Sequence, residues 1–258
     1  MRKKYLFIDF DGTIFDHVTQ SIPESTTKAI KQAKTNGHEV ILCTGRPPCL
    51  FYGADKTLEI DSYVAANGRV VVHKGEVIKS DNLSIEDMER VIELGNDLGV
   101  DVSVHGIEEM KVITDNDEVY KDFASYFHQH TPDIDPEYYK ENDIYQMTLY
   151  YTEDDYGKFN GMFPNLGFVY ACKYGIDVNT KGGLKEEGIK AFVDKFDIDL
   201  NDIIAIGDGY NDITMFNYVK TSVAMGNAHS DVKKHATMVT DSISNDGVSK
   251  ALKKLNLI

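Results

Sequence analysis

Two groups of acidic residues have the spacing of a site that could do chemistry. Asp9 and Asp11 stand two positions apart directly after an apolar run, so an extended strand end would direct both side chains toward the same side. Asp208 opens a second group, in which Asn211 and Asp212 follow three and four residues later and would share one helix face. Either group alone is equally read as a turn or a helix cap, where aspartate is common. Carboxylates that follow a buried strand, however, are costly unless they are paired or bound to a metal.

Together the two groups would place at least three carboxylates in one crevice, and their mutual repulsion demands a cation. A set of oxygen ligands selects a hard ion such as Mg²⁺. The sequence also offers groups for an anion: Thr44 and Gly45 end another apolar run, and Lys181 precedes Gly182 and Gly183 at the start of a predicted helix. A helix N-terminus binds anions and a lysine adds a point charge, although Lys181 alone is read as a solvated surface residue. In combination these groups predict a phosphate site.

Hydrolysis of a phosphate monoester is among the slowest uncatalysed reactions, and enzymes accelerate it by up to about 10²¹-fold. One hydrogen bond cannot supply an acceleration of this size. A workable division lets one carboxylate attack phosphorus, a metal neutralise the phosphate oxygens and a second acid protonate the departing alcohol.

The elements that would position these residues alternate between short apolar runs and helical patterns. The strand-like runs are 5–8, 40–43, 203–206, 223–225 and 238–240, and the helices span about 23–36, ended by Gly37, and 183–196. This alternation predicts parallel strands joined by crossovers, an α/β, Rossmann-like doubly wound core. Ligands bind beyond the carboxyl ends of such strands, so Asp9, Thr44 and Asp208 are expected to converge.

The middle of the chain has a different composition. Residues 81–178 contain ten of the 15 tyrosines and carry 22 acidic and six basic residues, a net charge of −16, whereas the remainder carries +1. Strand-like stretches at 145–151 and 168–174 accompany a helix at 84–98, which Ser84 and Asp87 would cap and Gly99 would end. We therefore predict an inserted α+β domain at 81–178 and a core formed by 1–80 and 179–258. The acidic surface is read as a solvated one that aids solubility.

Composition excludes several classes of protein. The 258-residue chain has a net charge of −15, which disfavours non-specific attraction to nucleic acid or to an anionic membrane. No apolar run approaches the roughly 18–20 residues of a membrane span, and the three cysteines show neither a disulfide framework nor a C-x-x-C zinc pattern. A cytoplasmic protein is expected, either a monomer or a small homo-oligomer.

Two further patterns are rejected. The acidic stretch that starts at Asp115 resembles a calcium loop, but Tyr120 and Tyr126 occupy the positions that require Gly and Glu. His128 and His130 would lie on different faces of a helix, so surface histidines are expected rather than a metal pair.

Four segments of the chain resemble, in order, the four motifs of the haloacid dehalogenase-like superfamily: 9–13 (Asp-Phe-Asp-Gly-Thr), 44–46 (Thr-Gly-Arg), 181–182 (Lys-Gly) and 207–212 (Gly-Asp-Gly-Tyr-Asn-Asp). The resemblance spans nearly the whole chain. Further similarity, at 66–68, 224–228 and 245–248, is to the Cof-like (type IIB) sugar phosphatases. In that branch a substrate-specificity cap is inserted between the second and third motifs, where the acidic segment lies.

The resemblance implies a role for each motif residue. Asp9 would be the nucleophile that forms an aspartyl-phosphate, and Asp11 would protonate the leaving oxygen and then activate water. Mg²⁺ would be held by the Asp9 carboxylate, the Asp11 backbone carbonyl and Asp208, with Asp212 in support. An ordinary Asp pKa near 3.9 leaves the group ionised at pH 7, so we expect Asp11 to have a raised pKa.

The implied phosphate ligands are the Phe10 backbone, Thr44, Gly45, Lys181 and Asn211. Arg46 would either reach the substrate or brace its loop. Asn67 would line the crevice, although Asn-Gly is equally a turn signal.

Three functions remain open. The leading one is a Mg²⁺-dependent phosphatase that hydrolyses small phosphate monoesters, such as sugar phosphates, and that disfavours polyanions because of its acidic insert. The second is a phosphomutase that uses the same intermediate and converts a sugar phosphate into its isomer. The third is a non-enzymatic sensor of a phosphorylated metabolite, which would tolerate Asp9→Asn; the intact Asp9 and Asp11 pair argues against it.

Overall fold

The computed structural model describes residues 2–126 and 130–258, so His128 lies outside the described residues. The chain divides into two compact units. The core unit comprises residues 2–46, Phe51–Ser80 and Gly183–Ile258, and the inserted unit comprises Pro47–Leu50 and Asp81–Gly182. The second boundary falls four residues beyond the expected one, because the last strand of the inserted unit runs to Thr180.

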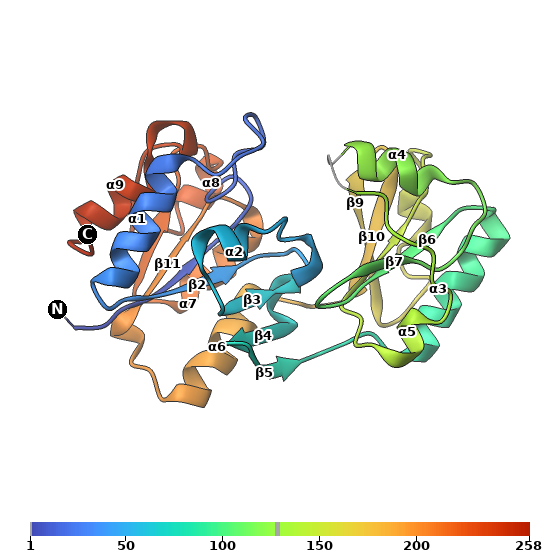
Figure 1. Cartoon of the computed structure of the whole chain (residues 1–258), viewed down its shortest axis with the longest axis horizontal. Coiled ribbons are helices and arrows are strands. Elements are labelled where there is room, and N and C mark those ends of the chain that lie inside the picture. Colours follow the sequence, from blue (N-terminus) through green and yellow to red (C-terminus); the bar gives the residue numbers. More distant parts are fainter. Residues whose placement is uncertain (1, 127–129) are drawn as a thin grey trace. The chain divides into compact units, whose positions relative to one another are not determined.

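An eight-stranded sheet forms the core unit, in the order β13-β12-β11-β1-β2-β3-β4-β5 (Figure 1). Its strands are β1 (Tyr5–Ile8), β2 (Glu39–Cys43), β3 (Tyr63–Ala65), β4 (Val70–His73), β5 (Glu76–Ser80), β11 (Ile203–Gly207), β12 (Thr221–Ala224) and β13 (Met238–Val239). Pairing is parallel from β13 to β3 and antiparallel from β3 to β5. The predicted α/β core is confirmed, with an antiparallel edge that the apolar runs did not predict.

The helices of the core unit connect these strands. They are α1 (Glu24–Thr35), α2 (Ala54–Leu58), α6 (Lys185–Phe196), α7 (Ile213–Tyr218), α8 (Ser230–Lys233) and α9 (Gly247–Lys254). Short 3₁₀ turns lie at η2 (Ala66–Gly68), η4 (Leu200–Asp202), η5 (Tyr210–Asp212) and η6 (Ile243–Asn245). Helix α1 begins after Pro23 and ends before Gly37, as predicted.

The central strands are apolar because both of their faces are covered. Phe7 of β1 and Ile41 of β2 are fully buried in one cluster with Ile189 and Phe192 of α6 and Met215 of α7. Removing such side chains from water supplies the main stabilisation, roughly 1.5–3 kcal/mol for each. Polar side chains are therefore confined to the strand ends, where the site lies.

The inserted unit holds an antiparallel five-stranded sheet in the order β7-β6-β8-β10-β9. Its elements are α3 (Ile85–Leu98), β6 (Val102–His105), β7 (Met110–Val112), α4 (Val119–Tyr126), α5 (Tyr138–Glu141), β8 (Gln146–Leu149), η3 (Tyr156–Phe159), β9 (Leu166–Cys172) and β10 (Gly175–Thr180), with η1 at Pro48–Leu50. Met88 and Val91 of α3 pack in a cluster with Val104, Met147 and Ile176 of the sheet. The sheet thus has a core of its own.

The predicted caps of α3 are confirmed. The Ser84 hydroxyl accepts a hydrogen bond from the Asp87 backbone N–H, and Gly99 ends the helix with a left-handed φ of 68°. All three cysteines are free. Across residues 2–126 and 130–258, no helix has the length and apolar character needed to cross a membrane.

Candidate active site

Three adjacent strands direct their carboxyl ends to the same edge of the core sheet. Strands β11, β1 and β2 are neighbours, and the residues that follow them are Asp208, Asp9 and Thr44. The Asp9 N–H continues the ladder by donating to the Ile206 carbonyl at 2.8 Å. The expected convergence of strand-end residues therefore follows from the sheet order.

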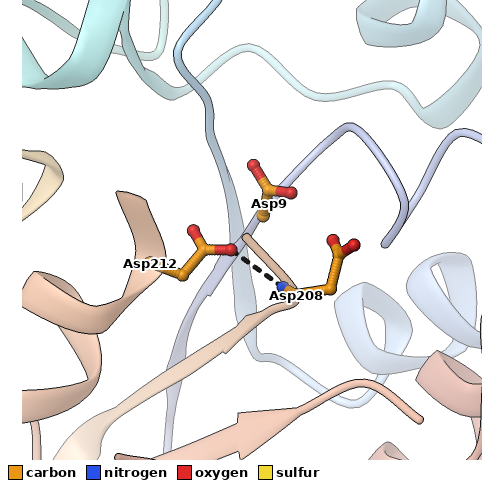
Figure 2. A group of neighbouring side chains, drawn as sticks. All are labelled: Asp9, Asp208 and Asp212. Atoms are coloured by element: carbon orange, nitrogen blue, oxygen red, sulfur yellow. Dashed lines mark hydrogen bonds between the residues drawn. The ribbon is translucent and has the colours of Figure 1, made fainter. Parts of the chain in front are cut away.

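A cluster of three carboxylates lies at this edge (Figure 2). Asp9, Asp208 and Asp212 each offer an oxygen, and these oxygens lie within 4.8 Å of one another. Asp9 and Asp212 are buried and Asp208 is partly buried. Oδ2 of Asp212 accepts hydrogen bonds from the backbone N–H groups of Asp208 and Gly209, both at 2.8 Å. Asp212 therefore fixes the loop that carries Asp208.

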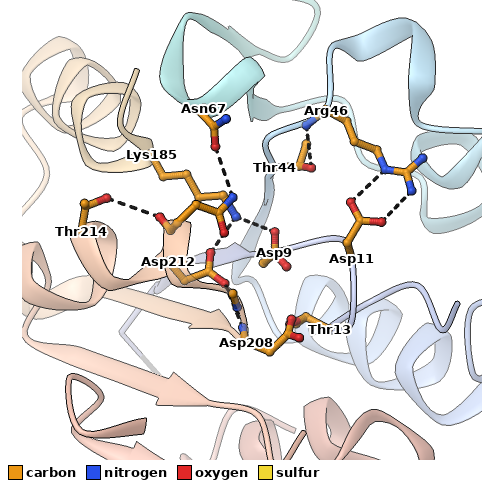
Figure 3. A network of polar contacts seen from close by, with 12 residues as sticks. Asp9, Asp11, Thr13, Thr44, Arg46, Asn67, Lys185, Asp208, Asp212 and Thr214 are labelled. Atoms are coloured by element: carbon orange, nitrogen blue, oxygen red, sulfur yellow. Dashed lines mark hydrogen bonds and ion pairs between the residues drawn. The ribbon is translucent and has the colours of Figure 1, made fainter. Parts of the chain in front are cut away.

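Lys185 inserts its ammonium between two of these carboxylates (Figure 3). Its Nζ lies 2.5 Å from Oδ1 of Asp9 and 2.6 Å from Oδ1 of Asp212, and the side chain is fully buried. Burial alone would lower the pKa of Lys185, but the charges of Asp212 and Asp9 raise it above its usual value. The lysine is therefore charged and holds Asp9 by Oδ1.

The sequence motif predicts Lys181 for this place, but the lysine that lies between the two carboxylates is Lys185. Lys181 belongs to the inserted unit, where its Nζ donates to the carbonyls of Phe163 and Pro164 at 3.0 and 2.9 Å. A signal for Lys185 was present in the sequence: it shares a helix face with Ile189, four residues on, and so lies in the apolar stripe of α6. A lysine in such a stripe must be paired.

The remaining charge of the cluster suits a divalent cation. When all three carboxylates are ionised, they and the one ammonium leave two negative charges. Burial, followed by repulsion from Asp212, raises the pKa of Asp9 well above its ordinary value. Burial chiefly, with a contribution from Asp212, raises the pKa of Asp208 to about 6. An all-oxygen donor set with excess negative charge fits Mg²⁺.

Asp208 is held by groups from the first motif. Its Oδ1 accepts a hydrogen bond from the Thr13 hydroxyl at 2.7 Å. Gly12 has a φ of +76°, and a Cβ there would overlap the Asp208 carboxylate. Glycine is therefore required at position 12 for the two motifs to approach each other.

Asp11 is bound differently from the other aspartates. Arg46 donates from Nε to Oδ2 of Asp11 at 2.8 Å and from Nη2 to Oδ1 at 2.6 Å (Figure 3). Nε2 of His17 lies 2.8 Å from the same Oδ1. Burial by itself would raise the pKa of Asp11, but the hydrogen bonds of His17 and Arg46 outweigh it and lower the pKa below the ordinary value. The expected raised pKa is therefore wrong for this conformation. No motif in the sequence predicts this contact of His17.

Arg46 is itself fixed by aromatic rings. Its guanidinium carbon lies 5.0 Å from the ring centre of Phe10 and 4.5 Å from that of Tyr52, distances at which a cation is attracted to a ring face. In this structure Arg46 pairs with the Asp11 carboxylate. The two roles expected for Arg46, reaching the substrate or bracing its loop, stay predictions.

The remaining predicted ligands gather near β2. Thr44 is buried, and its Oγ1 accepts the Arg46 N–H at 3.1 Å. Asn211 donates from Nδ2 to Oδ1 of Asn67 at 3.2 Å. A Cβ at Gly45 would lie about 3.1 Å from that same Asn67 oxygen. Asn67 thus stands between the second and fourth motifs, and its left-handed φ of 52° agrees with the turn signal.

Carboxylates that can hold a metal ion, with a buried lysine beside them at the carboxyl edge of a parallel sheet, are an arrangement suited to phosphoryl transfer in an α/β enzyme. Comparison with known proteins gives the family. A model of the haloacid dehalogenase-like hydrolases matches residues 6–252, and the chain belongs to this family.

Individual relatives agree with the family assignment. "Putative phosphatase YkrA" of Bacillus subtilis (strain 168) is 34% identical over 259 residues, which cover all of both chains. A crystal structure of a protein from Geobacillus kaustophilus HTA426 is 35% identical, with a TM-score of 0.92 over 99% of this chain and all of that one. A sugar phosphatase of HAD subclass IIB is 32% identical, with a TM-score of 0.79 over 99% and 100%. The chain thus stands among the phosphoric monoester hydrolases of the Cof-like branch.

Proposed function

We propose that the chain is a Mg²⁺-dependent phosphatase that hydrolyses small phosphate monoesters, sugar phosphates among them, through an aspartyl-phosphate on Asp9. The observation that carries this proposal is the Lys185 ammonium on Oδ1 of Asp9. It leaves Oδ2 of Asp9 for attack and helps to keep a deeply buried carboxylate ionised, as a nucleophile must be. The subclass IIB sugar phosphatase among the similar structures supports the substrate class.

The proposed reaction has two halves. In the first, an oxygen of Asp9 bonds to phosphorus while the bond from phosphorus to the alcohol oxygen breaks, and Asp11 gives that oxygen a proton. In the second, Asp11 takes a proton from water, the water oxygen bonds to phosphorus and Asp9 is released with inorganic phosphate. Because Arg46 and His17 favour the ionised carboxylate, the structure suits the second half, and these contacts must loosen for the first.

The other residues hold the ion and the phosphate. The Asp9 carboxylate, the Asp11 carbonyl and Asp208 would hold Mg²⁺, with Asp212 placing the Asp208 loop. When bound, the ion neutralises charge on the phosphate oxygens.

The proposed phosphate site is built from the first, second and fourth motifs together with the lysine. Thr44, Gly45, Asn211, the Phe10 backbone and Lys185, in place of Lys181, would contact the phosphate.

Phosphate release tests the proposal. The protein is assayed with a panel of sugar monophosphates in Mg²⁺ and in excess chelator, with Asp9→Asn as the control. Release of inorganic phosphate that needs both Mg²⁺ and Asp9 is expected. Isomer formation without release would identify the phosphomutase, and binding without turnover that survives Asp9→Asn would identify the sensor.

A further inference from the structure

Asn227 lies in one of the segments shared with the Cof-like branch, 224–228, to which the reaction above gives no role. The segment follows β12 and is tied to the end of β11, because the Met225 N–H donates to the Gly207 carbonyl at 2.9 Å. Gly207 directly precedes Asp208. The segment is therefore anchored beside the carboxylate cluster.

A second shared segment, 245–248, packs against the first, 224–228. A Cβ at Gly247 would overlap the Asp241 carbonyl and the side chain of Met225. A Cβ at Gly226 would overlap the backbone of Asp241 and Ser242, and the Gly226 N–H donates to the Asp241 carbonyl at 2.9 Å. Residues 241–247 can pack this closely only because both positions are glycine.

This packing places the Ile243 N–H 3.0 Å from Oδ1 of Asn227. With its oxygen held, the amide of Asn227 has one orientation, and its nitrogen faces the other way. Nδ2 then donates to the Gly12 carbonyl at 2.9 Å and to Oδ2 of Asp208 at 3.0 Å. The side chain thus joins the first motif to the fourth.

We propose that Asn227 is a positioning residue for the metal site, and that the close packing of residues 224–228 on 241–247, which Gly226 and Gly247 permit, orients it through the Ile243 N–H. Asp208 is then held from both sides, by Thr13 on Oδ1 and by Asn227 on Oδ2. The bond to the Gly12 carbonyl fixes the Gly12–Thr13 peptide. This peptide directly follows the one that carries the Asp11 carbonyl, a proposed ligand. Partners that orient metal ligands typically contribute 10- to 100-fold in metal affinity.

The inference rests on the proposed Mg²⁺ site and makes a separate prediction. Mg²⁺ binding is measured by calorimetry and by the metal-dependent rise in Tm, for the wild type, Asn227→Ala and Asn227→Leu. We expect the Kd for Mg²⁺ to rise about 10- to 100-fold in both variants. Activity should recover at high Mg²⁺, with little change in the KM for substrate.

Asn245→Ala is the matched control, since Asn245 sits in the supporting segment and its Nδ2 bonds only to the Ser242 hydroxyl among its described contacts. It should bind Mg²⁺ as the wild type does. Asn227 is exposed, so its variants should fold, and their Tm without metal checks this. If folded Asn227→Ala and Asn227→Leu bind Mg²⁺ with the wild-type Kd, this inference is overturned and the proposed function is unaffected. No Mg²⁺ binding by the wild type, or full binding by Asp208→Asn, would instead overturn the proposed function.

Discussion

Burial and bonding partners distinguish the lysine of the site, Lys185, from Lys181. Lys185→Met removes the cation between Asp9 and Asp212, whereas Lys181→Met removes hydrogen bonds to two carbonyls. We expect kcat/KM to fall at least about 100-fold in the first variant, the usual loss for a charge-stabilising group. The second should stay within about threefold.

Steady-state kinetics on a sugar monophosphate measures both variants. Lys185→Met also leaves buried carboxylates unpaired, a cost of about 3–5 kcal/mol, so its Tm is followed with and without Mg²⁺. Equal losses in the two variants would contradict the assignment.

Asp11 gives a prediction that depends on the leaving group. General-acid catalysis contributes about 10²- to 10⁴-fold, and p-nitrophenol departs without needing a proton. Asp11→Asn should therefore reduce kcat/KM by about that factor for an alkyl phosphate and much less for p-nitrophenyl phosphate. The value of kcat/KM reports only the steps up to formation of the aspartyl-phosphate. The later role of Asp11 in activating water therefore does not affect it. The same loss for both substrates would remove Asp11 from the acid role.

Asp208 should make metal binding depend on pH near 6. Its pKa is raised to about 6, so below this pH the carboxyl is protonated and must lose its proton before it can bind a cation. Through this group, Mg²⁺ affinity should fall by up to about tenfold per pH unit below pH 6. Any further change above pH 6 would come from Asp9, whose pKa burial raises well above its ordinary value. Calorimetry from pH 5 to 8, in buffers of different ionisation enthalpy, would also show the proton released. An affinity that is constant down to pH 5 would exclude this titration.

At this scale, the sequence predicted residues that follow strands and missed those set by tertiary packing. Asp9, Thr44 and Asp208 were found because each ends an apolar run, and the sheet order brings them together. His17 and Lys185 were missed because the short sequence motifs do not specify their positions relative to the aspartates. The direction of the Asp11 pKa could not be foreseen, since it depends on which donors the fold brings to the carboxylate.

At the scale of elements, one close contact sets the position of helix α6. A Cβ at Gly188 would overlap Val64 of β3 and the Cα of Gly68 in η2. Without side chains at positions 68 and 188, the helix can approach the turn closely, and it begins with Lys185. The lysine reaches Asp9 because its helix lies this close to the sheet.

Gly188→Ala should therefore affect both stability and activity. Overpacking of this kind costs about 1–3 kcal/mol, and a shift of α6 would displace Lys185. Denaturant unfolding and kcat/KM measure the two effects. Gly157→Ala is the control, because the nearest atom to its new Cβ lies 4.0 Å away, and it should change the free energy of unfolding by less than about 0.5 kcal/mol. Equal behaviour of the two variants would show that α6 tolerates displacement.

Element prediction succeeded where the pattern is local. The caps of α3 and the ends of α1 follow from Ser84, Gly99, Pro23 and Gly37. Strands β3 to β5 were not predicted. Strand β3 has only three residues, and β5 is largely exposed and so lacks an apolar run. Strand β4 does carry a run of three buried apolar residues, as β1 does, but no element was predicted there. The place of these three strands at the sheet edge depends on strand pairing between distant residues, which no local sequence pattern predicts.

At the scale of the whole molecule, charge should discriminate among substrates. The chain has a net charge of −15, made up of −16 on residues 81–178 and +1 on the remainder. Coulomb repulsion therefore opposes a polyanion such as ATP more than it opposes a sugar monophosphate, and salt screens that repulsion beyond about 8–10 Å at 0.1–0.15 M. We expect sugar monophosphates to exceed ATP in kcat/KM at low salt. We also expect the ratio to narrow as NaCl rises from about 20 to 200 mM, because screening helps the more highly charged substrate more.

A substrate panel at both salt concentrations, with free Mg²⁺ held constant, measures this effect. The comparison separates long-range charge from local fit, because a clash in the site would lower the ATP rate at every salt concentration. A ratio that does not change with salt would assign the discrimination to contacts within the site, and ATP turning over faster than every sugar monophosphate would show that the acidic insert does not repel it.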